Sequence, residues 1–138
     1  MALVYVVGLD GSVPSLLVKG FNPAWSPDSN TIAYVGGGDL KSPRGCDIRA
    51  TTPAGRHSSS LVDLATIAPD TKRCEVAEDL EWSPDGTRLA VVALRQPTPR
   101  SLINVAVFVV KADGSSARLF TPWGAHHGWW GLTWRPVA

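Results

Sequence analysis

An internal repeat constrains the fold of this chain more than any other feature of its sequence. Ala-Trp-Ser-Pro-Asp at 24–28 and Glu-Trp-Ser-Pro-Asp at 81–85 are each followed by an apolar run, Ile-Ala-Tyr-Val at 32–35 and Leu-Ala-Val-Val at 89–92. A truncated third copy, Thr-Trp-Arg-Pro-Val, stands at 133–137, with Arg135 in the place of Ser and Val137 in the place of Asp. Such self-similarity predicts structural units that stack on one another.

The residue types of the repeat predict β-hairpins. Ser-Pro-Asp-Gly at 83–86 places Ser, Pro and Gly at the first, second and fourth positions of a type I turn, where Pro presets φ and Ser caps the turn through its side chain. The Trp before the turn ends one strand, and the apolar run forms the next. Asp-Gly at 10–11 and 113–114 predicts a second hairpin in each unit, and 48–55 is its degenerate middle copy.

The whole chain is predicted to be all-β. Helical periodicity is nearly absent, while 13 Gly and 11 Pro supply many turns. Short, β-branched runs recur between the turn signals, and we expect each complete unit to be a four-stranded antiparallel meander. The predicted strands cover residues 3–7, 13–18, 22–25, 31–35, 47–51, 59–64, 79–82, 88–94, 103–110, 117–120 and 131–134.

The Ala-Trp-Ser-Pro-Asp and Ile-Ala-Tyr-Val pattern resembles the WD40-like, or PD40, repeats of TolB-type β-propellers. Similar blades occur in the propeller domains of prolyl-oligopeptidase-like peptidases. The resemblance covers nearly the whole chain and implies a propeller with a binding role. Residues 1–138 then form a single partial propeller domain: a half blade at 1–20, blades at 21–64 and 79–120, and a terminal strand at 131–138.

About two and a half to three blades cannot close a propeller, because closed rings have roughly four to eight blades. Open ends would leave apolar faces and strand edges exposed. We expect two chains to pair as a homodimer with six blades, in which the terminal strand of one chain lies beside the N-terminal hairpin of the other. The alternative is that the chain is a fragment of a longer propeller.

Loop lengths suggest where such a module binds. In a meander, alternate connections lie on opposite faces. The tight turns at 9–12, 26–30, 83–87 and 111–115 share one face, and the long loops at 36–45, 65–78, 95–102 and 121–128 share the other. Long loops on a rigid scaffold commonly carry recognition. We therefore expect a non-enzymatic module that binds a protein or peptide through its long-loop face.

The candidate ligand-binding residues lie in two of these loops. Tryptophan and histidine on a long loop can stack on a sugar or grip a peptide, although the tryptophans can equally pack between blades or between chains. An arginine on the rim can bind a carboxylate, although a solvated arginine is the simpler interpretation. The tryptophans of the repeat, Trp25, Trp82 and Trp134, are expected to be structural. The candidates are Trp123, His126, His127, Trp129 and Trp130, with Arg44 and Asp47 on the rim.

Several chemistries lack their sequence patterns. His126 and His127 are adjacent, and His57, Cys46 and Cys74 show no zinc spacing, so no metal site and no cofactor are expected. The two cysteines form either one disulfide or two inert thiols. The sequence has no Gly-x-Ser-x-Gly elbow, so no peptidase domain and no enzymatic activity are expected in this chain.

The remaining partner classes follow from charge and hydropathy. A formal net charge of +1 provides no basic field for nucleic acid. The apolar runs are too short to span a bilayer, and no signal peptide is evident in this chain. The resemblance implies a periplasmic or extracellular setting. Three alternatives to a peptide-binding module remain: a carbohydrate-binding propeller, a propeller fragment of a hydrolase, and a self-assembling array without a ligand.

Overall fold

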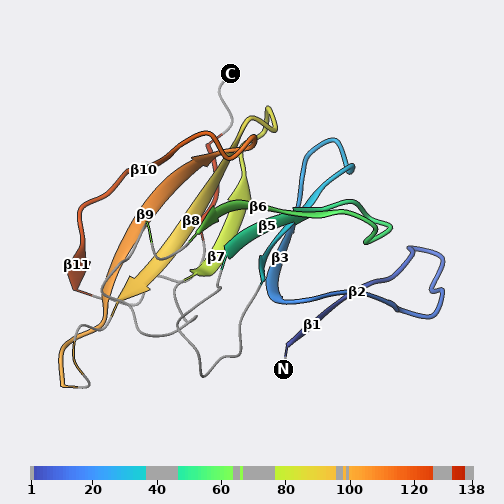
Figure 1. Cartoon of the computed structure of the whole chain (residues 1–138), viewed down its shortest axis with the longest axis horizontal. Helices are drawn as coiled ribbons and strands as arrows, with labels where there is room; N and C mark the ends of the chain where they lie inside the picture. The colour runs from blue at the N-terminus through green and yellow to red at the C-terminus, as the bar shows by residue number, and fades with distance from the viewer. Residues whose placement is uncertain are drawn as a thin grey trace.

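The computed structural model describes residues 2–36, 47–63, 66, 77–95, 98, 100–125 and 132–135. All the elements in these ranges are β-strands, which confirms the all-β prediction (Figure 1). They are β1 (Leu3–Val6), β2 (Ser15–Lys19), β3 (Phe21–Trp25), β4 (Ile32–Gly36), β5 (Asp47–Thr51), β6 (Ser58–Asp63), β7 (Ala77–Trp82), β8 (Arg88–Arg95), β9 (Asn104–Lys111), β10 (Ala117–Leu119) and β11 (Gly124–Ala125).

The strands form three antiparallel sheets that follow one another along the longest axis of the molecule (Figure 1). Strands β1 and β2 form the N-terminal hairpin. The middle sheet has the order β3-β4-β5-β6, and the last sheet has the order β10-β9-β8-β7, with β11 also paired to β9. In both larger sheets the strands are paired in chain order, so each is the antiparallel meander that the repeat predicts.

The structure corrects the sequence prediction at the C-terminal end of the chain. Residues 131–134 were expected to form a strand, but the described residues 132–135 have no strand pairing. Instead, the Leu132 amide donates to the Asp79 carboxylate at 2.8 Å, so a side chain takes the place of a strand neighbour. Conversely, β11 lies inside the predicted loop 121–128, because the chain returns to the edge of β9 after an interruption at 120–123.

The hairpin turns have the chemistry that their residues predict. In the turn of the last sheet, the Gly86 amide donates to the Ser83 carbonyl at 2.8 Å, and Ser83 Oγ accepts from the Arg88 amide at 2.9 Å. Ser83 Oγ also donates to Asp85 Oδ1 at 2.6 Å. The turn of the middle sheet repeats these bonds through Ser26, Asp28 and Thr31. The local motif therefore fixes both hairpins in the same way.

The core lies between the middle and last sheets. Their central strands carry near-continuous apolar runs, which fits burial on both faces rather than on one. Side chains pointing between the two sheets interdigitate in a single cluster. Its buried members are Ala33, Val35 and Ile48 from the middle sheet and Leu80, Trp82, Leu89, Val91, Ala93, Ala106, Phe108 and Val110 from the last sheet.

The repeated tryptophan joins each unit to the preceding one. Trp82 Nε1, on β7, donates to the carbonyl oxygen of Ala24 on β3 at 3.0 Å. Trp134 Nε1 donates to the carbonyl oxygen of Glu81 on β7 at 2.9 Å. In both cases the acceptor is the residue that precedes the tryptophan of the previous repeat. The indole thus combines an apolar ring for the core with one donor that fixes its position.

The turn of the middle sheet contains a strained residue that the last sheet avoids. Ser29 has φ 61°, whereas its counterpart Gly86 has φ 70°, a conformation that costs glycine little.

We predict that Ser29→Gly raises the free energy of unfolding by about 0.5 kcal/mol, because the relief of strain exceeds the added backbone entropy of the unfolded chain. Urea unfolding followed by circular dichroism measures this. Gly86→Ser is the reverse control, since a Cβ there meets nothing closer than Pro27 Cδ at 3.8 Å. Equal stability of all three proteins would contradict the prediction.

The indole hydrogen bond gives a second prediction. Trp82→Phe keeps an aromatic ring but leaves the Ala24 carbonyl without this donor, and it should lower the free energy of unfolding by about 1–2 kcal/mol. Urea midpoints at equal slope measure the difference. Trp134→Phe removes the equivalent bond at a more exposed position and should cost less. A larger loss for Trp134→Phe than for Trp82→Phe would show that the buried contact is not the stronger one.

Candidate functional site at the long-connection end

The two ends of the sheets differ in how their strands are connected. At one end, which we call the tight-turn end, each connection contains a turn closed by a backbone hydrogen bond between residues three apart. These connections are residues 7–14, 26–31, 52–57, 83–87 and 112–116. At the other end, the middle sheet is connected through residues 37–46 and the last sheet through residues 96–103, while residues 64–76 join the two sheets. The strand ends at this side are marked by the pairs Gly36–Asp47 and Arg95–Asn104. We call this side the long-connection end.

The structure describes two of the candidate ligand-binding residues, Trp123 and Asp47. The other candidates, Arg44, His126, His127, Trp129 and Trp130, lie outside the described residues, as do both cysteines, Cys46 and Cys74.

Trp123 is attached to the core of the last sheet. Its ring meets the ring of Phe108 edge-on, with centroids 5.9 Å apart and planes at 63°. Phe108 is buried, and Trp123 is one of the partly buried side chains that pack against the core cluster. Trp123 precedes β11, whose pairing with Val105 and Asn104 holds the chain at the long-connection end. Packing therefore fixes part of the ring and leaves the rest exposed to solvent.

Asp47 begins β5 and takes part in a polar network on the face of the middle sheet that is directed toward the N-terminal hairpin. Its Oδ2 accepts from Arg49 Nη1 at 3.2 Å, and the two side chains are 20% and 27% exposed, respectively. Arg49 Nε donates to Ser58 Oγ at 2.9 Å, and the Tyr34 hydroxyl lies 2.6 Å from the same Oγ. The carboxylate is thus already paired within its own sheet.

Arg49, Ser58 and Tyr34 are not among the ligand-binding residues that the sequence predicts. A signal was available for part of the network, since Asp47 and Arg49 are two positions apart on one strand and therefore point to the same face. The role of Tyr34 was hidden, because it depends on cross-strand register and on Gly36, over which the ring packs: a Cβ at Gly36 would lie 2.6 Å from Tyr34 Cε2. Strand pairing, rather than any local motif, assembles this group.

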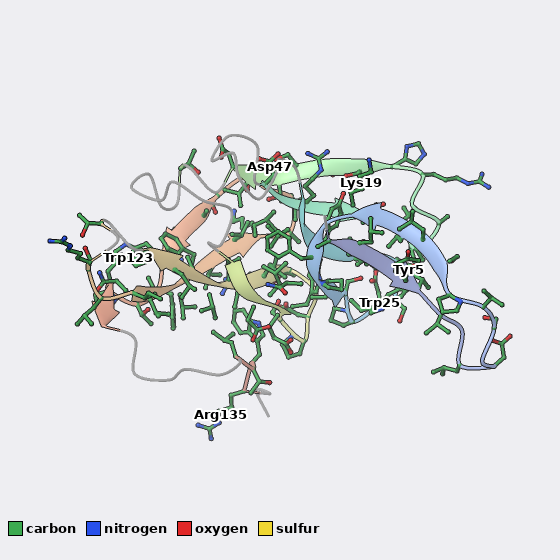
Figure 2. The ribbon with its side chains drawn as sticks, turned by 90° about the horizontal axis from the view of Figure 1, so that it is seen from below. Tyr5, Lys19, Trp25, Asp47, Trp123 and Arg135 are labelled. Carbon is green, nitrogen blue, oxygen red and sulfur yellow. The ribbon has the colours of Figure 1, made fainter. Side chains whose placement is uncertain are left out.

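Trp123 directly precedes β11 in the last sheet, whereas Asp47 begins β5 in the middle sheet. Figure 2 shows Trp123 on the last sheet, at the opposite end of the stack from Tyr5 and Trp25, with Asp47 on the middle sheet between them. The described part of the candidate site is therefore an aromatic group and an ion pair on neighbouring sheets, both at the long-connection end.

The tight-turn end carries carboxylates held in their ionised form. Hydrogen bonds from the Ser83 hydroxyl and from the Thr87 amide and hydroxyl lower the pKa of Asp85 to about 2. The Ser26 hydroxyl and Asn30 lower the pKa of Asp28 in the same way. Bonds from Ser12 and Ser115 lower the pKa of Asp10 and Asp113. These carboxylates serve the turns, which explains their positions without a ligand.

Comparison with known proteins does not assign a family: no family model matches the chain, and a search of curated proteins finds no significant match. Among the described residues, no group of three or more His, Cys, Asp and Glu side chains is arranged to hold a metal ion. No helix in the described ranges has the length and hydropathy to cross a membrane.

The turn carboxylates predict how stability depends on pH. Because the pKa of Asp85 is lower in the folded chain than its ordinary value of 3.8, its hydrogen bonds stabilise the fold above about pH 4. This contribution is lost as the pH falls toward about 2. We predict that the thermal midpoint of the wild type falls over this range and that Asp85→Asn, which does not titrate, falls less. Melting curves at pH 2 to 5 measure both, and parallel pH profiles would contradict the assignment.

Proposed function

We propose that this chain is a non-enzymatic binding module of the β-propeller type that recognises a protein or peptide at its long-connection end. Each larger sheet corresponds to a blade and the N-terminal hairpin to half a blade, with a second copy completing a six-bladed ring. Three findings support this interpretation: the antiparallel meanders, their face-to-face stacking, and the tryptophan contact that recurs at the same repeat position.

The observation that carries the binding role is the difference between the two ends of the sheets. Each connection at the tight-turn end contains a turn closed by a backbone hydrogen bond. The carboxylates at that end, Asp10, Asp28, Asp85 and Asp113, accept hydrogen bonds from their own turns. The long connections begin and end on rigid strands, which is the arrangement by which scaffolds present recognition loops. In a closed ring, the long connections of all blades would share one side.

A peptide or protein suits the described residues at this end. A partly exposed, core-anchored indole offers apolar area at little entropic cost, as aromatic anchors do at protein interfaces. The Asp47–Arg49 pair adds a polar group on the neighbouring sheet. Aromatic anchors beside polar groups are a common composition of such interfaces.

A random-peptide display library and a glycan array, both probed with the purified chain, test this proposal. We expect enrichment of a peptide motif, and loss of its binding by at least tenfold in the double variant Trp129→Ser and Trp130→Ser. Lys111→Ala, at the tight-turn end, is the matched control and should bind like the wild type. Binding only on the glycan array would show that the ligand is a carbohydrate and not a peptide. If the enriched peptides bind the Trp129→Ser and Trp130→Ser double variant as well as the wild type, the binding site does not include these tryptophans.

A further inference from the structure

The three sheets are joined by a second repeated contact, which involves the glycine of each tight turn between the third and fourth strands of a unit. A Cβ on Gly55, in the middle sheet, would lie 2.9 Å from the Leu17 carbonyl oxygen in the N-terminal hairpin. A Cβ on Gly114, in the last sheet, would lie 2.7 Å from the Leu61 carbonyl oxygen in the middle sheet. Each turn therefore fits against the preceding unit so closely that only glycine is accommodated.

The sequence position of the contacted residue is constant. Leu17 is six residues after the turn glycine of its own unit (17 − 11 = 6), and Leu61 is also six residues after its turn glycine (61 − 55 = 6). The same step from Gly114 leads to Phe120 (120 − 114 = 6), at the far end of the stack. The side chain of Phe120 is 75% exposed.

The N-terminal hairpin has the complementary property. Gly11, the corresponding glycine, has φ +75° like the other two, but a Cβ there would have no described atom within 4 Å. One end of the stack thus carries a turn glycine without a neighbour. The other end carries the exposed backbone segment on which such a glycine would rest.

The tryptophan contact is open at the same two ends. Trp82 is 7% exposed and uses the Ala24 carbonyl, whereas Trp25 is 49% exposed, and its indole N–H has no acceptor among the described residues. By the rule of the repeat, the acceptor for Trp25 is the residue before Trp134, which is the exposed Thr133. A donor at the first end therefore matches an acceptor at the other.

Both open ends also expose apolar side chains. On the hairpin, Val4 points inward and is buried, so its neighbours on the other face point away from the middle sheet. The exposed apolar residues of the hairpin are Leu3, Tyr5, Val7, Leu9, Val13 and Leu16, and together with Gly11 and Trp25 we call them the front face. Leu119, Phe120 and Thr133 form the back face. Large apolar side chains exposed at both ends of a stack are candidates for contact with a further unit.

We propose that the front face of one copy packs on the back face of a second copy, so that Gly11 rests on the Phe120 backbone and Trp25 Nε1 donates to the Thr133 carbonyl. This inference rests on the proposed blade repeat and names the surfaces that would close the ring. Each junction joins unlike faces, front to back, and the two junctions of the dimer are related by a two-fold axis, which closes the assembly.

The variant Gly11→Asn tests the proposal. Asparagine tolerates a positive φ, and its Cβ meets no described atom in the single chain, but it would meet the Phe120 backbone in the assembly. By light scattering, we expect the wild type to be a dimer and Gly11→Asn to be a monomer. The thermal midpoint of Gly11→Asn should be close to that of the wild type diluted until it is monomeric. Gly55→Asn and Gly114→Asn, with φ +67° and +74°, carry the same strain and should destabilise the fold itself.

Mixing two variants distinguishes a front-to-back contact from a contact between two like faces. Phe120→Asp breaks the back face, and we expect this variant to be monomeric as well. An equimolar mixture with Gly11→Asn restores one intact junction, so a heterodimer should form at a dissociation constant weaker than that of the wild type. Trp25→Phe removes one hydrogen bond from each of the two junctions, so its dimer should be weaker than that of the wild type by about 25-fold.

Three results would overturn the inference: a monomeric wild type at every concentration tested, a dimeric Gly11→Asn variant, or the absence of a heterodimer in the mixture. Each is distinguishable from failure of the proposed function, which is measured by peptide enrichment. A monomeric chain that still binds the enriched peptides would refute the second copy and leave the binding role standing. A dimer without any enriched peptide would support the contact with a second copy and refute the peptide-binding role.

Discussion

The structure depends on a hydrogen bond from the indole of one sheet to a backbone carbonyl of the preceding sheet. Apolar packing between two sheets is strong but non-directional, so packing alone leaves neighbouring sheets free to slide. The Trp82 donor removes that freedom, because its ring is buried in the core while its N–H selects the Ala24 oxygen. Trp134 repeats the arrangement on Glu81. The turn glycines add a second fixed point near the opposite edge of the sheets, where the Gly55 and Gly114 turns rest on the backbone of the preceding unit. At the junction between the middle and last sheets, these two contacts together define both the spacing and the direction of stacking.

This rigid stacking explains why the two ends of the sheets can have different tasks. At the tight-turn end, each carboxylate is held by the hydroxyl and amide groups of its own turn, as the low pKa of Asp85 shows. Those residues consolidate hairpins and have little freedom for anything else. The long connections arise from strands that the core already fixes. Trp123 shows the combination that results: one side of its ring meets Phe108, and the side chain as a whole is only partly buried.

The same contacts that order the stack also leave it directional. The junction between the middle and last sheets uses a donor and a turn of the last sheet, Trp82 and Gly114, and two backbone carbonyls of the middle sheet, Ala24 and Leu61. The stack ends in two unlike faces, with Gly11 and Trp25 on one side and Phe120 and Thr133 on the other. The dimer that we propose would bring these unlike faces together, front to back.

The sequence by itself determined the strands, the hairpins and the repeat. Periodicity, Ser-Pro-Asp turns and Asp-Gly turns are local signals, and the strand at Asp47–Thr51 agrees with its prediction at both ends. The segment 131–134 was wrongly expected to be a strand, since strand pairing needs a neighbouring edge that local residues do not reveal. Only the tertiary structure decided that Trp123 packs on Phe108 and that Arg49 pairs with Asp47 and bonds to Ser58. The tertiary structure also decided that the turn glycines Gly55 and Gly114 each pack against a backbone carbonyl of the preceding unit, six residues after the turn glycine of that unit. These contacts join residues that are distant in sequence or on different strands, so their geometry exists only once the sheets have formed and stacked.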